Sequence, residues 1–583
     1  MESLRWLWQQ IHPSRAKFIM AMILCAVATP LSLIAAFLTP TIIEDLIPNK
    51  DLRGLIIVLL ILTGIVFIKT CMRYLFVNMF EKVSQRFLFD VRGRMYDKIQ
   101  RMDFEFFDKN RTGDLMARMT GDIESIRDFL ARVVFLVIEQ SLTFIIAVVM
   151  LFVLNAKLAA IMVVMCPVIA VLAVKLSSTI RPAFQEVREQ FSKLNTVVQE
   201  NISGNRVVKA FAKESYEMEK FEVENDAYRD LNLKASDVWA NFLPKIELIN
   251  SLIFVAMIIV GGWFVIDGQM TIGVLAGFNA YLWAISGPMS MVGPLALDIQ
   301  RFFTNTDKVV YLSNVESDIN IDEDRKVKRE ISGKVEFENV SFGYRDNSIL
   351  KNISFAVKPG ETIGIIGPTG SGKSTLVNLI PRFYDVSSGK IKIDGVDVKQ
   401  IELQHLRKHI SMSMQDIFLF SDTIEGNIVY GSPEAPFEDA VESAKLAAAD
   451  EFIVKCSDGY DTIIGERGVG LSGGQKQRIS LARAIIVDPT ILILDDTTSS
   501  VDIETEKRIH NDLKDLYNEK TTFIIAHRIS SIMNADKILV LADGEIIENG
   551  THNELLEKKG NYYNIFMNQH GDSYTEVEEE EVL

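Results

Sequence analysis

The chain has 583 residues, which is too long for one ordinary soluble domain, and 48% of them are hydrophobic. Its formal net charge of −16 argues against nucleic acid as a partner, because proteins that bind nucleic acid normally present a basic face to the phosphates. The 4 cysteines include no C-x-x-C pair, which argues against a disulfide framework or a zinc site.

Six apolar runs before about residue 300 are long enough to cross a bilayer, which takes roughly 20 residues. The long gaps after the second and fourth runs, residues 78–132 and 177–245, are rich in Lys and Arg and should face the cytoplasm, together with both termini. We therefore predict an all-α transmembrane bundle of six long helices with cytoplasmic extensions, over residues 1–312. The runs are Phe18–Ile42, Leu55–Val77, Val133–Leu154, Leu158–Leu176, Ile246–Ile266 and Ile272–Leu295.

Several polar residues lie within these runs, where an unpaired polar side chain is costly. For Glu139, Asn279 and Trp283 two interpretations stay open, a substrate path through the bundle or hydrogen bonding between helices. Together with Tyr281, these residues would suit an amphipathic or cationic drug, a lipid or a peptide equally well.

A polar and charged segment, residues 313–333, follows the last run and is predicted to be a linker. A strand-like stretch at Lys334–Phe342 begins a second domain, which we place at residues 334–570. The apolar strand Thr362–Ile366 then runs into a loop of the form G-x-x-x-x-G-K-S, and a helical pattern follows from Thr375. The loop consists of Gly367, Pro368, Thr369, Gly370, Ser371, Gly372, Lys373 and Ser374.

This loop has the composition of a phosphate-binding loop. Its glycines allow backbone N–H groups to approach phosphate oxygens, and the helix that follows adds the positive end of its dipole. Lys373 would place a charge on the β- and γ-phosphates, and Ser374 would offer its hydroxyl to Mg²⁺. We therefore expect an α/β P-loop NTPase domain that binds ATP with Mg²⁺.

A further apolar strand, Ile491–Leu494, ends in two carboxylates. Asp495 is placed to hold Mg²⁺, and Asp496 is placed to orient the water that attacks the γ-phosphate. Neither role needs covalent chemistry, because phosphoryl transfer depends mostly on positioning and charge stabilisation.

A third motif, Leu471-Ser472-Gly473-Gly474-Gln475, lies a short helix before Asp495. It resembles the signature of ATP-binding-cassette (ABC) proteins, and the chain resembles the exporter-type half-transporters of that superfamily from end to end, in particular bacterial multidrug-type exporters. The resemblance implies a composite ATP site, in which the phosphate loop of one subunit faces the signature of a second subunit.

The resemblance also implies roles for residues outside the three motifs. Tyr344 looks like the aromatic that stacks on adenine, Gln415 like the glutamine that contacts Mg²⁺ or water, and His527 like the histidine that touches the γ-phosphate. Phe106–Asp108 and Gly204–Phe211 are similar to the two segments that carry coupling helices. Taken singly, Tyr344, Gln415 and His527 would be ordinary strand or loop residues, and only their order around the motifs favours the functional interpretation.

One position departs from the family pattern. Efficient members usually have Glu after the Mg²⁺-binding Asp, whereas this chain has Asp496, whose carboxylate is one methylene shorter. Misplacement on the ångström scale costs about 100-fold in rate. We therefore expect a site that binds ATP and hydrolyses it slowly, and the resemblance favours a heterodimer with a different half-transporter over a homodimer in which Asp serves adequately.

These observations predict ATP-dependent export of a hydrophobic or amphipathic substrate by alternating access, from a multi-pass position in the cell (plasma) membrane with membrane lipid as neighbour. The alternatives are a homodimeric lipid or peptide exporter or flippase, and a membrane ATPase that acts as a sensor without cargo. An acidic tail at residues 571–583 is expected to be solvated.

Overall fold

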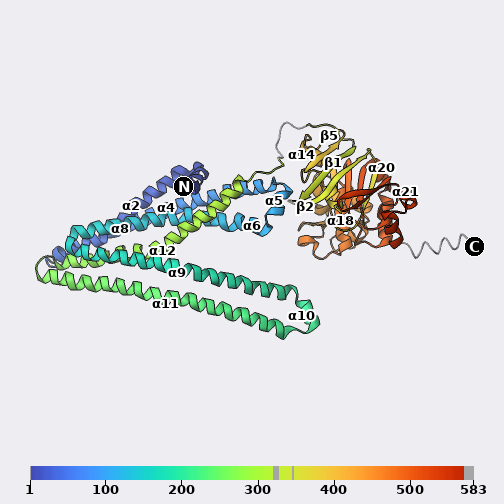
Figure 1. Cartoon of the computed structure of the whole chain (residues 1–583). Coiled ribbons are helices and arrows are strands. Elements are labelled where there is room, and N and C mark those ends of the chain that lie inside the picture. Colours follow the sequence, from blue (N-terminus) through green and yellow to red (C-terminus); the bar gives the residue numbers. More distant parts are fainter. Residues whose placement is uncertain (1, 320–326, 345–346, 570–583) are drawn as a thin grey trace, which may run out of the picture. The chain divides into compact units, whose positions relative to one another are not determined.

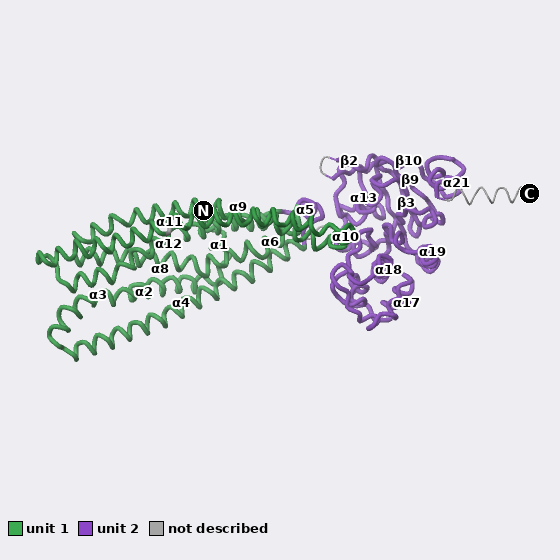
Figure 2. The backbone as a smooth tube through the Cα atoms, turned by 90° about the horizontal axis from the view of Figure 1, so that it is seen from below, with its two compact units in different colours: residues 1–100, 110–315 green, residues 101–109, 316–583 purple. Residues whose placement is uncertain are grey.

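A computed structural model describes residues 2–319, 327–344 and 347–569 of the chain. These residues form two units, which Figure 2 colours separately. The first comprises residues up to Gln100 together with Asn110–Val315, and the second comprises Arg101–Lys109 together with the chain from Glu316 onward. The acidic tail at 571–583 and residues 320–326 of the expected linker lie outside the described residues.

The first unit is all-α and contains six helices that are long and apolar enough to span a membrane. They run over His12–Leu46, Leu52–Gln100, Thr112–Leu154, Ala156–Ser203, Glu214–Ile266 and Ile272–Asn314. The helical segments are α1 (Glu2–Gln10), α2 (Arg15–Leu31), α3 (Ile34–Thr41), α4 (Leu52–Gln100), α6 (Thr112–Ala117), α7 (Ile123–Asp128), α8 (Val134–Leu154), α9 (Ala156–Ser203), α10 (Asn205–Phe211), α11 (Glu214–Ile266) and α12 (Ile272–Asn314).

The spanning helices after the first continue well past their apolar runs, as predicted. Figure 1 shows α9 and α11 side by side, with α10 joining their far ends. Outside the apolar runs, polar pairs hold these two helices together. Gln190 donates to Glu224 at 2.5 Å, and Asn201 donates to Glu217 at 2.8 Å.

The second unit is an α/β domain built on two sheets (Figure 1). One sheet is antiparallel with strand order β2-β1-β4-β5, and the other has the order β10-β9-β3-β8-β7-β6 and is parallel from β9 to β6. The strands are β1 (Val335–Tyr344), β2 (Asn347–Val357), β3 (Thr362–Ile366), β4 (Ser388–Ile393), β5 (Val396–Asp397), β6 (Ile410–Ser413), β7 (Ile491–Asp495), β8 (Thr521–Ile525), β9 (Lys537–Ala542) and β10 (Glu545–Gly550). The helices are α5 (Phe104–Lys109), α13 (Lys373–Asn378), α14 (Leu403–Lys408), α15 (Ile424–Ile428), α16 (Phe437–Leu446), α17 (Asp450–Ile453), α18 (Gly473–Ile485), α19 (Ile503–Asp512), α20 (Lys514–Glu519) and α21 (His552–Glu557).

The central strands are continuous apolar runs because both faces of the parallel sheet are covered. In β7, Leu492 and Leu494 pack into one hydrophobic core, while Ile491 and Ile493 pack into the core on the opposite face. All five residues of β3, β7 and β8 are buried. The predicted fold class, six long helices plus an α/β domain, is confirmed.

Parallel order brings the ends of four strands to one edge of the sheet, because β3, β8, β7 and β6 are neighbours. The segments that follow these strands hold the phosphate loop, His527, Asp495 with Asp496, and Gln415. In open α/β sheets ligands bind at this carboxyl edge. The topology therefore gathers residues that are far apart in the sequence.

Candidate nucleotide-binding and catalytic site

The glycine-rich loop leaves β3 and enters α13 at Lys373, two residues before the start expected from the sequence. Gly370 and Gly372 have φ of +83° and +99°, in the left-handed region that favours glycine. A Cβ on Gly372 would lie 2.7 Å from the Leu350 side chain. The loop conformation thus depends on glycine at Gly372, which the motif specifies, and is favoured by glycine at Gly370, where the motif allows any residue.

Lys373 is folded back over this loop. Its Nζ donates to the carbonyl oxygens of Gly367 and Pro368, both at 2.9 Å. Burial lowers the pKa of the Lys373 ammonium, and the nearby Asp495 and Asp496 carboxylates act in the opposite direction. An anion that enters the loop would therefore meet a buried cation that, among the described residues, donates hydrogen bonds to backbone carbonyl oxygens of the loop.

The donor set fits nucleotide phosphates and Mg²⁺. The Ser371 hydroxyl oxygen is buried and has no hydrogen-bond partner among the described residues, so the loop holds a polar group that a phosphate oxygen would satisfy. The Asp495 side chain is only 3% exposed and accepts a hydrogen bond from Ser374. Burial raises the pKa of the Asp495 carboxyl, while that hydrogen bond acts in the opposite direction. A hydroxyl paired with a carboxylate beside the phosphate loop is a set of oxygen ligands suited to Mg²⁺.

Asp496 follows β7 in a left-handed conformation, with φ of +52°. Its N–H donates to the carbonyl of Ile525 at 3.0 Å, which ties this turn to the end of β8. Non-glycine residues rarely adopt such backbone angles, and where they do, the position is often functional.

Half of the predicted residues line one cavity of about 230 Å³ at the carboxyl edge of the sheet, and Asp496 is not among them. Gln415 and His527 reach it from the segments after β6 and β8, although they lie far from the loop in the sequence. The predicted residues that line it are Thr369, Gly370, Gly372, Lys373, Ser374, Thr375, Gln415, Asp495 and His527.

The signature residues lie apart from this cavity. Ser472 begins α18 as its N-cap: its hydroxyl accepts from the N–H of Gln475 at 3.3 Å, and the Gln475 side chain accepts from the Ser472 N–H at 2.8 Å. Ser472 and Gly473 are exposed. Within the part of the chain that the structure describes, the lining of the phosphate-loop cavity contains no residue from Ser472–Gln475.

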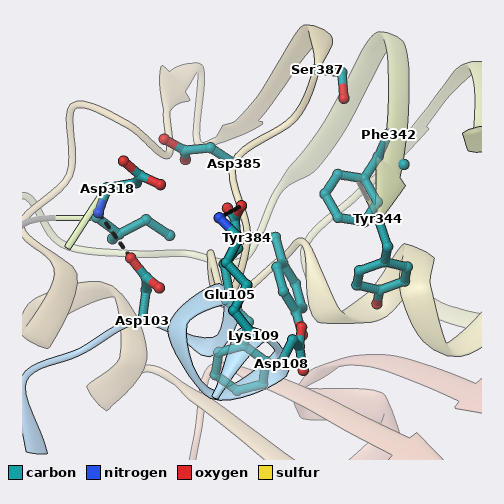
Figure 3. Close-up of a pocket in the computed structure, with 13 residues that line it drawn as sticks. Asp103, Glu105, Asp108, Lys109, Asp318, Phe342, Tyr344, Tyr384, Asp385 and Ser387 are labelled. Carbon is teal, nitrogen blue, oxygen red and sulfur yellow. Dashed lines mark hydrogen bonds and ion pairs between the residues drawn. The ribbon is translucent and has the colours of Figure 1, made fainter. Parts of the chain in front are cut away.

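Tyr344 lines a second cavity of about 260 Å³, shown in Figure 3. Its ring meets those of Phe342 and Tyr384 edge to face, with centroids 5.0 and 5.1 Å away. The Tyr384 hydroxyl donates to Asp108 of α5 at 2.9 Å, and burial raises the pKa of that hydroxyl. The aromatic face expected to hold adenine thus belongs to a cluster that also contacts α5.

Sequence reasoning missed Gln477, which is 5% exposed. Its side-chain amide donates to the Asp496 carbonyl at 3.2 Å and to the Ser499 hydroxyl at 3.0 Å, and it accepts from the Ser500 N–H at 3.0 Å. Gln477 therefore joins the signature helix to the turn that carries Asp496. The only signal in the sequence is its position two residues after the signature.

Sequence reasoning also missed Glu506 on α19, whose side chain is 2% exposed. Its carboxylate accepts from Arg528 at 2.6 Å, from Thr498 at 3.3 Å and from the Ser531 hydroxyl. These donors come from the segments just after Asp496 and His527, so one buried carboxylate fixes both. Nothing in the local sequence distinguishes Glu506 from the exposed Glu504.

In the first unit, the prediction of a substrate path is wrong for Tyr281. This side chain is 0% exposed, and its hydroxyl donates to the Leu33 carbonyl at 3.3 Å, so it packs between helices. Asn279 and Trp283 are exposed and Glu139 is half-buried, which leaves both interpretations of these three residues open.

Two protein families match the chain. The pattern described as "ABC transporter transmembrane region" matches residues 18–289, and the pattern described as "ABC transporter" matches residues 350–499. The ABC transporter ATP-binding protein YknU of Bacillus subtilis (strain 168) is 36% identical over 574 residues, which cover 98% of each chain. An ATP-dependent lipid A-core flippase of Syntrophus aciditrophicus (strain SB) is 36% identical over 98% of this chain and 95% of its own length.

The solved structure of a bacterial Atm1-family ABC exporter with ATP bound also resembles the chain. Its TM-score is 0.79 at 27% identity, over 95% of this chain and 98% of that one. The chain therefore belongs to the ABC transporter family. It is a half-transporter of the exporter type, with a six-helix membrane unit fused to an ATPase domain, and it carries out ATP-dependent export across a membrane.

Proposed function

We propose that the chain exports a hydrophobic or amphipathic substrate by alternating access, paired with a different half-transporter, and that its own ATP site hydrolyses slowly. The observation that carries this proposal is Asp496 at the position where a longer carboxylate would reach the attacking water. The left-handed turn is fixed by the hydrogen bond from the Asp496 N–H to Ile525, so backbone movement offers little compensation for the missing methylene.

Each residue of the site has a part in this proposal. The loop Gly367–Ser374 binds the phosphates through its N–H groups, and Lys373 neutralises their charge. Ser374, Asp495 and Gln415 would hold Mg²⁺, which when bound neutralises charge on the β- and γ-phosphates. Asp496 orients water, and His527 contacts the γ-phosphate. Tyr344 stacks on adenine, and its half-buried ring in the aromatic cluster with Phe342 and Tyr384 supports this role.

The signature Ser472–Gln475 supports a composite site because its first two residues are exposed and it lies outside the phosphate-loop cavity. In a dimer it would cover ATP held by the partner, so that two ATP molecules join the ATPase domains. Nucleotide then shifts the membrane helices between two arrangements by the difference in its affinity for the open and closed forms. The chain combines an intact signature with a shortened carboxylate at Asp496. Such a subunit would complete the ATP site of a partner well, whereas its own ATP site would hydrolyse slowly.

Residues of the membrane unit and the name of one relative support the proposed class of substrate. Exposed Asn279 and Trp283 and half-buried Glu139 offer both polar and aromatic contacts. One relative is named for a lipid A-core, which is an amphipathic molecule. We place the protein in the plasma membrane, and the Lys and Arg of the long segments between the spans support an orientation with both termini in the cytoplasm.

ATPase turnover of the purified full chain tests the weakened site. We expect slow turnover for the wild type and an increase of about 10- to 100-fold for Asp496→Glu, because one added methylene restores the reach of the carboxylate. The matched control is Asp488→Glu, an exposed aspartate with a similar φ of +49°, which should leave turnover unchanged.

Lys373→Ala gives the background rate of the preparation. Brisk wild-type turnover without a second polypeptide, unaffected by Asp496→Glu, would show that Asp serves adequately and would remove the argument for a heterodimer. Export itself is measured as ATP-dependent accumulation of a fluorescent amphipathic dye in inverted vesicles, with the partner subunit present.

A further inference from the structure

A cavity of about 490 Å³ lies between α9 and α12 in the first unit. The two helices touch closely just before it: a Cβ on Gly293 would lie 2.7 Å from the Ala173 carbonyl oxygen, and Ser177 donates to the Gly293 carbonyl at 3.3 Å. Beyond this contact the small residues give way to large side chains, and the space opens. We call it the arginine cavity, after Arg181, Arg188 and Arg301 in its lining.

The arginine cavity carries an excess of positive charge. Its lining residues include three arginines and no aspartate or glutamate. Arg181 donates to Gln300, which is neutral, and Arg301 lies 3.6 Å from Asp298, a carboxylate that Arg132 also contacts at 3.0 Å. Among the described residues, no hydrogen bond or ion pair joins Arg188 to a partner. At least one guanidinium is therefore available to an anion.

The remaining lining suits a ligand with a polar head and an apolar body. Gln300 and Thr304 offer an amide and a hydroxyl beside the arginines, and Ile180, Phe184 and Leu297 add apolar surface. The position of the arginine cavity along α9 and α12 also fits a lipid headgroup. It begins just after the apolar runs of α9 and α12, on the half of α12 that leads into the ATPase domain. A bilayer centred on the apolar runs would place its lipid phosphates near this end of the runs.

We propose that the arginine cavity binds a phosphate-bearing anion, either the headgroup of an anionic phospholipid or a free phosphate. Guanidinium groups pair with phosphate oxygens in a fork geometry, and several of them together favour a headgroup of net negative charge over a zwitterionic one, whose phosphate is accompanied by a cation. The site stands apart from the proposed export function, because its ligand need not be the cargo.

The test is native mass spectrometry of the full chain in detergent, titrated with phosphatidylglycerol or with phosphatidylcholine of the same acyl chains. Wild-type protein should bind phosphatidylglycerol about tenfold more tightly, and Arg188→Gln should remove most of that preference. Arg86→Gln is the matched control, because Arg86 is an exposed arginine at a similar distance beyond the apolar run of α4. Arg181→Gln provides a second, independent variant.

Inorganic phosphate at millimolar concentration separates the two sources. Displacement of phosphatidylglycerol by phosphate assigns the free anion as a ligand, whereas retention of the lipid assigns the headgroup with its chains. Equal binding of the two lipids by the wild type, or an unchanged preference in both Arg188→Gln and Arg181→Gln, would overturn the proposal. Because no transport is measured, either result is independent of the export function.

Discussion

The buried carboxylate of Glu506 shows how one residue can fix two segments of the candidate site. It accepts hydrogen bonds from Thr498 and Arg528, on either side of the site. Glu506→Gln keeps the shape but replaces one acceptor with a donor that faces Arg528. We expect the free energy of unfolding to fall by roughly 2 kcal/mol, which is the size of a hydrogen bond to a charged group. The Tm of the full chain should fall by about 5 °C.

The readout that separates positioning from stability is the ATPase rate at a temperature where both proteins are folded. Glu506→Gln should lower turnover more than it weakens nucleotide binding, because His527 is displaced while the phosphate loop is intact. Glu504→Gln, an exposed residue of the same helix, should change neither. Equal turnover in the two variants would show that Glu506 has no part in positioning.

The contrast between predicted and missed residues has a physical cause. Lys373 and Ser374 could be predicted because they belong to one contiguous motif that follows a buried strand. Glu506 and Gln477 could not, because each acts through buried contacts with residues that lie elsewhere in the chain. Tyr281 was wrongly placed on a substrate path. A polar side chain in an apolar run can face a cavity or donate to a carbonyl of a neighbouring helix, and the sequence does not distinguish the two.

At the scale of elements, α5 belongs with the ATPase domain although its sequence lies within the membrane unit. Asp103 holds it there: one carboxylate oxygen accepts from the Phe106 N–H at 2.8 Å, and the other accepts from Asp318 at 2.8 Å and Ser317 at 2.7 Å. Phe104 stacks on Phe383 with centroids 4.4 Å apart. The sequence indicated a coupling-helix segment at Phe106–Asp108. It gave no sign that Asp103 contacts Ser317, because a contact between residues 214 positions apart leaves no local pattern.

Asp103→Ala should release this segment. Burial alone would raise the pKa of the Asp103 carboxyl, but the hydrogen bonds from Ser317, Phe106 and Asp318 outweigh it and lower the pKa below its ordinary 3.8. The stabilisation is therefore complete above that value and is lost as the pH falls through the lowered pKa. We expect the Phe106 and Asp318 amides to exchange hydrogen about tenfold faster in Asp103→Ala.

Hydrogen exchange measured by mass spectrometry on the full chain checks this prediction. After correction for intrinsic rates, the difference should be constant between about pH 5 and 8, because the carboxylate stays ionised there. Glu105→Gln is the control: it breaks only an exposed ion pair with Lys109 on the same helix. Similar protection in Asp103→Ala and wild type would show that the aromatic stacking holds α5 without the carboxylate.

At the scale of the whole molecule, the separation of the signature from the phosphate loop supports the proposed composite site, which a second subunit would complete. Ser472 caps α18 within its own chain, and in the proposed composite site it would also face nucleotide held by the partner. Substitution can separate these two roles. Asp and Asn are as good as Ser at an N-cap, so both keep the helix start. Only Asp adds a negative charge that would repel the γ-phosphate.

We therefore expect Ser472→Asp to reduce ATPase activity of the assembled transporter at least about tenfold, since one like-charge contact on this scale costs more than 1.4 kcal/mol. Ser472→Asn should retain most of the activity, and a fluorescent ATP analogue should bind the isolated chain equally well in both variants. If Ser472→Asp instead weakens binding to the isolated chain, the signature acts on its own phosphate loop, and the second subunit is not needed to complete the site.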